Sequence, residues 1–430
     1  MNERLYFFST EKGKFVFDGE AVSIYHYEDI VDLEIQQTSY LPLPDSHRSH
    51  FLRTVCLILN NSCNLCCKYC YAHQGLYDKP FEQLRFEKGV EAIDYISKSA
   101  MMHNSNNITI AFFGGEPLLS FNLIKKLVSY AENKYPKLIK KYQITTNGTL
   151  INDSIAEFME KYNFNIMISI DGGKEHHNKY RRFKNGMGSY DDVVLGASLI
   201  QNKELLNARI TITDVNVLMH EYIDTILNLG IKRITFAVDY NITDDNFALY
   251  LESIKNLTNK YITDIKSGVF YEITNFTKIL SLVIFHNKIK NHCNAGISYI
   301  TLSADGRYYL CPRFVGMSKF CIGTDDNAVE RYKYILENKL KNSAADRSFN
   351  CKNCCFAFIC GGVCMHHAYT STKNIFGDVS KECEERKTVF KSALKLLCSL
   401  SVSERRNFLL FLTEIWHENN FKEVNSNEHN

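Results

Sequence analysis

Apolar runs and helical segments alternate through residues 51–239, and this pattern restricts the fold more than any other feature of the chain. Helical spacing of apolar residues is found at 85–100, 120–135, 153–162 and 221–230. The short apolar runs that flank these segments cover 51–60, 108–113, 142–147, 164–171, 208–213 and 233–239. Such alternation predicts an α/β fold with a parallel sheet, open or closed into a barrel. Because six strands are too few for an eight-unit barrel, we expect a partial (β/α)6 barrel.

The composition of the chain indicates a packed protein with neither a nucleic-acid nor a membrane partner. Of the 430 residues, 45% are hydrophobic and 23% are charged, which suffices for a sizeable core. The formal net charge of +2 gives no strong attraction to nucleic acid or to a membrane surface. The chain has no apolar run of about 18 residues and no signal-peptide pattern at residues 1–10, so we expect a cytoplasmic protein.

Fifteen cysteines fall into two groups that are separated by a long cysteine-free stretch. The first group is Cys56 with the four cysteines of CNLCCKYC at 63–70, and the second holds nine cysteines between Cys293 and Cys383. Cys398 stands apart from both groups. Disulfides are rare in a reducing cytosol, so this distribution favours metal binding or catalysis.

The CNLCCKYC segment has the spacing Cys63-x3-Cys67-x2-Cys70, with Cys66 left over. It follows the first predicted strand, and the carboxyl ends of parallel strands are where α/β proteins bind ligands. Structural zinc sites use four ligands in paired arms, whereas this loop offers three thiolates and no fourth ligand nearby. The loop therefore predicts an iron–sulfur cluster with one iron left open, and a zinc knuckle is the alternative.

This cysteine motif, with an aromatic residue before its last cysteine, resembles that of the radical S-adenosylmethionine (SAM) enzymes. In that family the open iron of a 4Fe–4S cluster binds the amino and carboxylate groups of SAM. Reductive cleavage of SAM then yields a 5′-deoxyadenosyl radical, which abstracts a hydrogen atom from an unreactive C–H bond. The resemblance assigns the difficult chemistry to the cofactor, so we assign no catalytic residue beyond the cluster and SAM.

The segment FFGGEP at 112–117 follows the second predicted strand and is similar to the family's GGEP motif. Glycines let the backbone approach a ligand closely, and a carboxylate can accept hydrogen bonds from an ammonium group. The resemblance therefore implies that Gly114, Gly115 and Glu116 bind SAM, with Glu116 at its amino group.

Polar segments also follow the third and fourth predicted strands, namely TTNGTL at 145–150 and SIDG at 169–172. The family places ligand-facing polar residues there, which implies that Ser169 contacts the ribose of SAM. Arg209 lies on the fifth predicted strand. It is expected either to meet the SAM carboxylate or to form an ion pair at the strand end.

The second group of cysteines resembles the SPASM extension of radical SAM peptide-modifying enzymes, which binds two auxiliary 4Fe–4S clusters. The matching pattern is Cys293-x12-Gly306-x4-Cys311, then Cys351-x2-Cys354-x5-Cys360-x3-Cys364, and finally Cys383. The resemblance implies three 4Fe–4S clusters in all. The pairing used in the family assigns the distal auxiliary cluster to Cys351, Cys354, Cys360 and Cys383, and the proximal one to Cys293, Cys311 and Cys364.

The proximal set has three cysteines, because the 285–292 segment lacks the extra cysteine that some relatives carry there. This implies either an open iron, which could bind a substrate thiolate, or a fourth ligand from Cys321. The remaining cysteines, and Cys321 if it is not that ligand, are expected to be small buried hydrophobes: Cys56, Cys66, Cys355 and Cys398.

Four segments are expected along the chain. They are a short β-rich element at 1–50, the radical SAM barrel at 51–275, the SPASM domain at 285–390 and a helical tail at 391–430. The first segment is expected either to grip a leader peptide through an exposed strand edge or to act as a structural cap.

The resemblance implies a maturase that modifies a ribosomally made peptide, with thioether cross-linking from cysteine as the expected reaction. The expected partners are a precursor peptide with a leader sequence and a small electron donor such as flavodoxin or ferredoxin. The alternatives are an anaerobic sulfatase-maturating enzyme, a peptide epimerase or carbon–carbon cross-linking enzyme, and an iron–sulfur electron-transfer protein. Two residues weigh against sulfatase maturation, namely Phe113, where that family has glutamine, and Pro312, where it has an aspartate base.

Overall fold

The computed structural model describes residues 4–26, 51–77, 80–214, 217–330 and 349–420. The chain forms two compact units, each drawn from separate stretches of sequence. The first unit takes residues from 1–42, 212–292 and 342–430, and the second takes residues from 43–211 and 293–341. Part of the expected N-terminal element, 27–50, and the end of the expected helical tail, 421–430, lie outside the described residues.

A mixed, mainly parallel sheet forms the centre of the second unit. Within this unit the strand order is β8–β7–β6–β5–β4–β11–β12–β13. Strands β4 to β8 and β11 are parallel, whereas β12 and β13 run antiparallel. The predicted α/β fold is therefore confirmed. The strand bounds are Thr54–Ile58 (β4), Asn107–Phe113 (β5), Ile139–Thr146 (β6), Asn165–Ser169 (β7), Leu206–Ile212 (β8), Tyr299–Leu302 (β11), Tyr308–Tyr309 (β12) and Cys321–Gly323 (β13).

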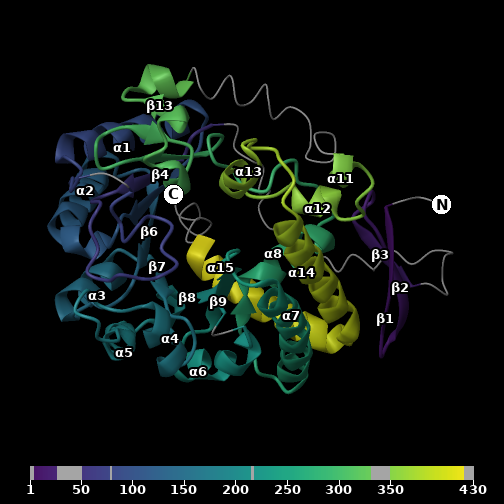
Figure 1. The fold of residues 1–430 in the computed structure, drawn as a ribbon. Helices are drawn as coiled ribbons and strands as arrows, with labels where there is room; N and C mark the ends of the chain where they lie inside the picture. Colours follow the sequence, from purple (N-terminus) through teal and green to yellow (C-terminus); the bar gives the residue numbers. More distant parts are fainter. Residues whose placement is uncertain (1–3, 27–50, 78–79, 215–216, 331–348, 421–430) are drawn as a thin grey trace, which may run out of the picture. The chain divides into compact units, whose positions relative to one another are not determined.

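Helices follow the parallel strands of the second unit and lie along the outer side of the sheet (Figure 1). The buried residues of the first helix include Ala92, Ile93, Ile96 and Ala100, which recur at helical spacing on one face. Strand β4 is buried continuously from Val55 to Ile58, as expected for a parallel strand covered on both faces. The helix bounds are Phe86–Met102 (α1), Phe121–Lys134 (α2), Asp153–Lys161 (α3), Lys174–Tyr180 (α4) and Tyr190–Leu199 (α5).

Strands β11, β12 and β13 extend the sheet beyond β4 and were not predicted. Strand β11 pairs in parallel with β4, so that Tyr299 lies opposite Thr54. It is joined to β12 by a tight turn in which Gly306 has a φ of +79°, a backbone conformation that favours glycine. These strands have only two to four residues each. Runs that short carry too little periodicity to be recognised in the sequence.

The first unit combines a small antiparallel sheet with a helical layer. Strands β1, β2 and β3 pair in that order, and α14 contacts α7, α8 and β1. No helix in the described part of the chain is both long and apolar enough to cross a membrane. The bounds are Leu5–Thr10 (β1), Gly13–Asp18 (β2), Ser23–His26 (β3), Ile223–Asn228 (α6), Arg233–Val238 (β9), Asp244–Lys266 (α7), Glu272–Ile273 (β10), Thr274–Ile284 (α8), Phe349–Lys352 (α11), Ala357–Cys360 (α12), Met365–Thr372 (α13), Ser380–Ser399 (α14) and Val402–Asn420 (α15).

Candidate active site

The loop between β4 and α1 carries Cys63, Cys67 and Cys70, all of them half-buried. Burial raises the pKa of the Cys63 thiol to about 12, with smaller contributions from the charges of Glu116, Cys67 and Cys70. The three sulfurs are therefore close enough to interact electrostatically. Cys66 differs from them, because its thiol donates a hydrogen bond to the carbonyl oxygen of Phe183 at 3.4 Å.

The three cysteines offer the type of ligand that an iron–sulfur cluster uses. No three His, Cys, Asp or Glu side chains among the described residues are grouped so as to hold one metal ion. An iron–sulfur cluster is held by cysteine thiolates, and the 63–70 segment offers thiol groups for that purpose. A bound metal reverses the effect of burial on the pKa of these thiols, because a thiol that coordinates a metal is deprotonated.

The GGEP turn lies directly against the start of the cysteine loop. The amide of Gly115 donates to the Asn60 carbonyl at 3.1 Å, and the amide of Glu116 donates to the Ser62 carbonyl at 2.7 Å. A Cβ atom on Gly115 would lie 2.0 Å from the Ser62 oxygen, and one on Gly114 would lie 2.7 Å from the Asn60 oxygen. The two glycines are thus required for the close contact between this turn and the segment that precedes Cys63.

The carboxylate of Glu116 is buried, with 1% of the residue exposed, and it joins the loops that follow β5 and β6. Its Oε1 accepts from the Thr146 hydroxyl at 2.7 Å and from the Leu118 amide at 3.0 Å. Its Oε2 accepts from the Asn147 amide at 2.8 Å. Since each carboxylate oxygen has two lone pairs, Oε2 keeps one acceptor position for a further donor.

Replacing Glu116 by alanine should lower both stability and SAM binding. Three buried donors would lose their acceptor, which we expect to reduce the free energy of unfolding by about 3 kcal/mol. Denaturant unfolding under anaerobic conditions measures this change, and Glu157→Ala, at an exposed position of α3, provides the control. A Glu116→Ala protein as stable as the wild type would show that these hydrogen bonds contribute little.

Ser169 and Arg209 lie side by side on neighbouring strands. Ser169 ends β7, and its Cα is paired in register with that of Arg209 on β8. Both residues are half-buried. Burial raises the pKa of Asp171, and the positive charge of Arg209 is one of several influences that oppose this rise. The register places both residues near the carboxyl edge of the sheet, where the SIDG segment begins.

A buried group formed by Tyr69, Asp171 and Arg181 was not predicted. The Tyr69 hydroxyl donates to Asp171 and accepts from Arg181 Nη1 at 2.6 Å, while Asp171 also accepts from the Thr211 amide at 2.8 Å. Arg181 is 7% exposed, and its Nε has no hydrogen-bond partner among the described residues. Its charge counteracts the effect of burial on the pKa of Cys67. Arg181 is thus a buried cation close to the cysteine loop.

The predicted distal cysteines all belong to the first unit, and their charges influence one another. Burial, with smaller contributions from the charges of Cys351 and Cys354, raises the pKa of Cys360 to about 11. The charge of Cys354 likewise raises the pKa of Cys383. For the predicted proximal set, Cys293 and Cys311 belong to the second unit and Cys364 to the first.

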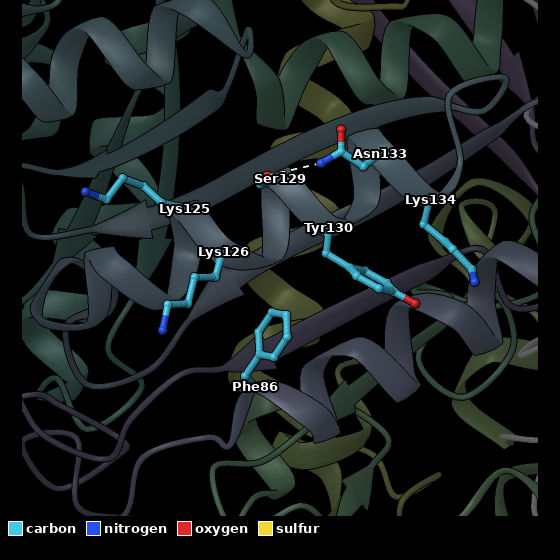
Figure 2. Close-up of a pocket in the computed structure, with 7 residues that line it drawn as sticks. All are labelled: Phe86, Lys125, Lys126, Ser129, Tyr130, Asn133 and Lys134. Carbon is cyan, nitrogen blue, oxygen red and sulfur yellow. Dashed lines mark hydrogen bonds between the residues drawn. The ribbon is translucent and has the colours of Figure 1, made fainter.

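A surface pocket of about 590 Å³ lies on α1 and α2 and shares no residue with the cysteine loop. Figure 2 shows the Phe86 and Tyr130 rings next to each other, and they are perpendicular, with centroids 6.3 Å apart. The remaining lining residues are Lys125, Lys126, Ser129, Asn133 and Lys134. Without cysteines or acidic side chains, this pocket does not contribute to the candidate active site.

The segment that carries these motifs matches a known protein family. The model of the Radical SAM superfamily matches residues 57–229. An uncharacterized protein of Methanocaldococcus jannaschii is 30% identical over 294 residues, which cover 65% of this chain and 91% of that protein. A cysteine-type anaerobic sulfatase-maturating enzyme of Clostridium novyi is 25% identical over 79% of this chain and 94% of its own length. The radical SAM cyclopropyl synthase TigE of Paramaledivibacter caminithermalis is 24% identical over 73% and 68%, respectively.

Solved structures show the same fold. The structure described as native anSMEcpe with bound AdoMet and Kp18Cys peptide superposes with a TM-score of 0.68 at 21% identity, covering 80% of this chain and 98% of that one. Streptococcus suis SuiB bound to its precursor peptide SuiA gives a TM-score of 0.51 at 18% identity, covering 76% and 75%. By its sequence, its relatives and its fold, the chain belongs to the radical SAM superfamily of enzymes.

Proposed function

We propose that this enzyme modifies a ribosomally made peptide and that it forms thioether cross-links from cysteine. The grouping of Cys351, Cys354, Cys360 and Cys383 in one unit carries this proposal, because it supports an auxiliary cluster in addition to the SAM cluster. One relative is named a cysteine-type anaerobic sulfatase-maturating enzyme. The structural neighbour SuiB was solved with a bound precursor peptide. A leader-bearing precursor peptide and a flavodoxin or ferredoxin are the partners that we propose.

The described residues have distinct roles in this proposal. Cys63, Cys67 and Cys70 would hold the SAM cluster, and Glu116 would use its remaining Oε2 acceptor position for the SAM amino group. Ser169 and Arg209, paired across β7 and β8, would contact the rest of SAM. When bound, SAM and its cluster supply hydrogen-atom abstraction from a C–H bond, and auxiliary clusters supply an acceptor for the remaining electron.

The proximal auxiliary cluster would use Cys293, Cys311 and Cys364. Cys321 is the candidate for a fourth ligand, because it pairs in register with Tyr309, two residues before Cys311. If Cys321 is not a ligand, the cluster would keep an open iron for a substrate thiolate. Three 4Fe–4S clusters correspond to roughly twelve irons per chain, which iron analysis of the anaerobically reconstituted protein tests.

Formylglycine formation, as in sulfatase maturation, is the second candidate function. It is favoured by the similarity to the Clostridium novyi enzyme over 94% of its length. Phe113 opposes it because that family has glutamine at this position. Pro312 opposes it because proline cannot replace the aspartate base of that family. To separate the two functions, the enzyme is given SAM, a reductant and either a sulfatase-derived cysteine peptide or a candidate precursor peptide. A product that retains its sulfur but loses two hydrogens supports thioether formation, whereas loss of sulfur supports formylglycine.

We further propose that the N-terminal sheet β1–β3 is a structural cover for the cysteine turn at 351–358. The backbone at Gly19 approaches Cys355 so closely that a Cβ atom would lie 1.7 Å from its carbonyl oxygen. Arg4 donates to the Lys352 carbonyl at 3.0 Å, and its guanidinium lies 4.5 Å from the centre of the Phe358 ring. These contacts favour a cap over a site that is free to grip a leader peptide.

Gly19→Ala should therefore loosen the cover and make the distal cluster labile. The added methyl group must push the Cys355 backbone away, which we expect to cost about 2 kcal/mol of stability. The rate at which a chelator removes iron measures the exposure of the cluster, and Glu20→Ala, at an exposed neighbouring position, is the matched control. Equal rates of iron loss in Gly19→Ala and the wild type would argue against the cover.

A further inference from the structure

A buried carboxylate on α14 connects several segments of the first unit that carry cysteines. Glu382 is 2% exposed and directly precedes Cys383. Its Oε1 accepts from the backbone amide of Cys364 at 2.7 Å, and its Oε2 accepts from His367 Nδ1 at 2.7 Å. One side chain thus joins the helix that carries Cys383 to the loop that carries Cys364 and to the helix that follows it.

Arg386 also donates to this carboxylate. Its Nη2 and Nε donate to Glu382 Oε1 at 2.7 and 3.0 Å, one helical turn along α14. Its Nη1 donates to His292 Nδ1 at 2.8 Å, so His292 accepts there as a neutral ring. A buried carboxylate with four donors and a partner cation is a fixed element of structure, because neither charge can leave the other without a large desolvation cost.

The cation of this pair lies close to a predicted cluster ligand. Arg386 follows Cys383 by three residues on α14, so the two residues lie on the same side of that helix. Its charge also opposes the effect of burial on the pKa of Cys360. His367 is held from its other side, since its ring stacks on Tyr240 with centroids 4.2 Å apart. Tyr240 in turn donates to Glu385, which also accepts from Tyr250 at 2.6 Å. The Glu382–Arg386 pair is therefore surrounded by side chains that are themselves held by contacts.

We propose that Glu382 and Arg386 form a positioning pair for the distal auxiliary cluster, in which Glu382 fixes the cysteine segments and the Arg386 charge sets the reduction potential. This inference rests on the proposed distal cluster at Cys351, Cys354, Cys360 and Cys383. The reduction potential of an iron–sulfur cluster depends on nearby charge and on hydrogen bonds around its ligands. In the native pair the two charges compensate each other.

The pair predicts potential shifts of opposite sign. In Glu382→Gln the Arg386 cation is left uncompensated beside Cys360, which favours the more negative reduced cluster and raises its midpoint potential. In Arg386→Met the Glu382 carboxylate is left uncompensated, which lowers the midpoint potential. The double variant removes both charges and should return towards the wild-type value. If the pair served only for packing, both single variants would shift the midpoint potential in the same direction.

The experiment is a redox titration of the anaerobically reconstituted full chain, followed by electron paramagnetic resonance. The distal signal is identified as the one that is lost in Cys354→Ala. Glu384→Gln is the matched control, because it makes the same charge change at an exposed position of α14 and should leave the potential unchanged. Opposite shifts in the two single variants support the proposal, and equal or absent shifts overturn it.

Two further results keep the test decisive. If the neutral variants lose the distal signal, Glu382→Asp and Arg386→Lys are compared, since they keep the charges. Retention of the signal in these variants supports the proposal, and its loss there overturns it. If the wild type itself shows no distal signal, the proposed cluster fails and this inference fails with it. A wild type with a distal signal that none of the variants shifts refutes the positioning pair alone.

Discussion

Replacing Cys67 by alanine should abolish reductive cleavage of SAM. Cys67 lies in the middle of the β4–α1 loop, between Cys63 and Cys70, and it is close to the buried Arg181 cation. Loss of one of three thiolate ligands leaves the SAM cluster without a stable attachment. We expect the rate of 5′-deoxyadenosine formation under reducing anaerobic conditions to fall by at least about 100-fold. Chromatographic measurement of 5′-deoxyadenosine against time gives this rate.

The neighbouring Cys66 provides the matched control for this experiment. Its thiol donates a hydrogen bond to the Phe183 carbonyl. Cys66→Ala should retain SAM cleavage within a few-fold of the wild type, because it removes a weak donor and no ligand. The assignment of ligands would be contradicted by the reverse result, in which Cys66→Ala is inactive and Cys67→Ala still cleaves SAM.

Replacing Cys354 by alanine should separate SAM cleavage from peptide modification. Cys354 belongs to the first unit and Cys67 to the second, so the SAM cluster should assemble without Cys354. We expect SAM cleavage to continue while modified peptide falls below detection, because the electron left after C–H abstraction has lost its acceptor. The measurement is the ratio of modified peptide to 5′-deoxyadenosine in one reaction mixture.

Cys355→Ala is the control for Cys354→Ala, because the two side chains are hydrogen-bonded neighbours. Since Cys355 lies outside the predicted ligand pattern, this variant should keep most of the product yield. Full product yield from Cys354→Ala would show that the distal cluster is dispensable.

Much of the fold could be predicted from the sequence, because each parallel strand is long enough to show its apolar run. The segment 108–113, for example, corresponds to β5 with a difference of one residue. The pairing of β11 with β4 could not be predicted in the same way. It joins Tyr299 to Thr54 across more than two hundred residues, and the four-residue strand β11 has no distinctive pattern of its own.

The candidate site was only partly predictable for a similar reason. Motif spacing identifies Glu116, but it does not reveal that three groups of the chain itself already donate to the carboxylate. Arg181 follows a short helix in an ordinary polar segment, and nothing in the sequence indicates that it is buried beside Tyr69. Contacts of this kind depend on tertiary packing, which brings the 69 and 181 positions together.

The mass of the modified peptide tests the central claim most directly. A small cysteine-containing peptide encoded beside this gene is co-expressed with the enzyme under anaerobic conditions, alkylated at its free thiols and weighed by mass spectrometry. Thioether formation predicts the loss of two hydrogens for each cross-linked cysteine and no alkylation at those cysteines. An unchanged mass with every cysteine alkylated would contradict the proposal, and incorporation of deuterium from heavy water would then point to epimerisation.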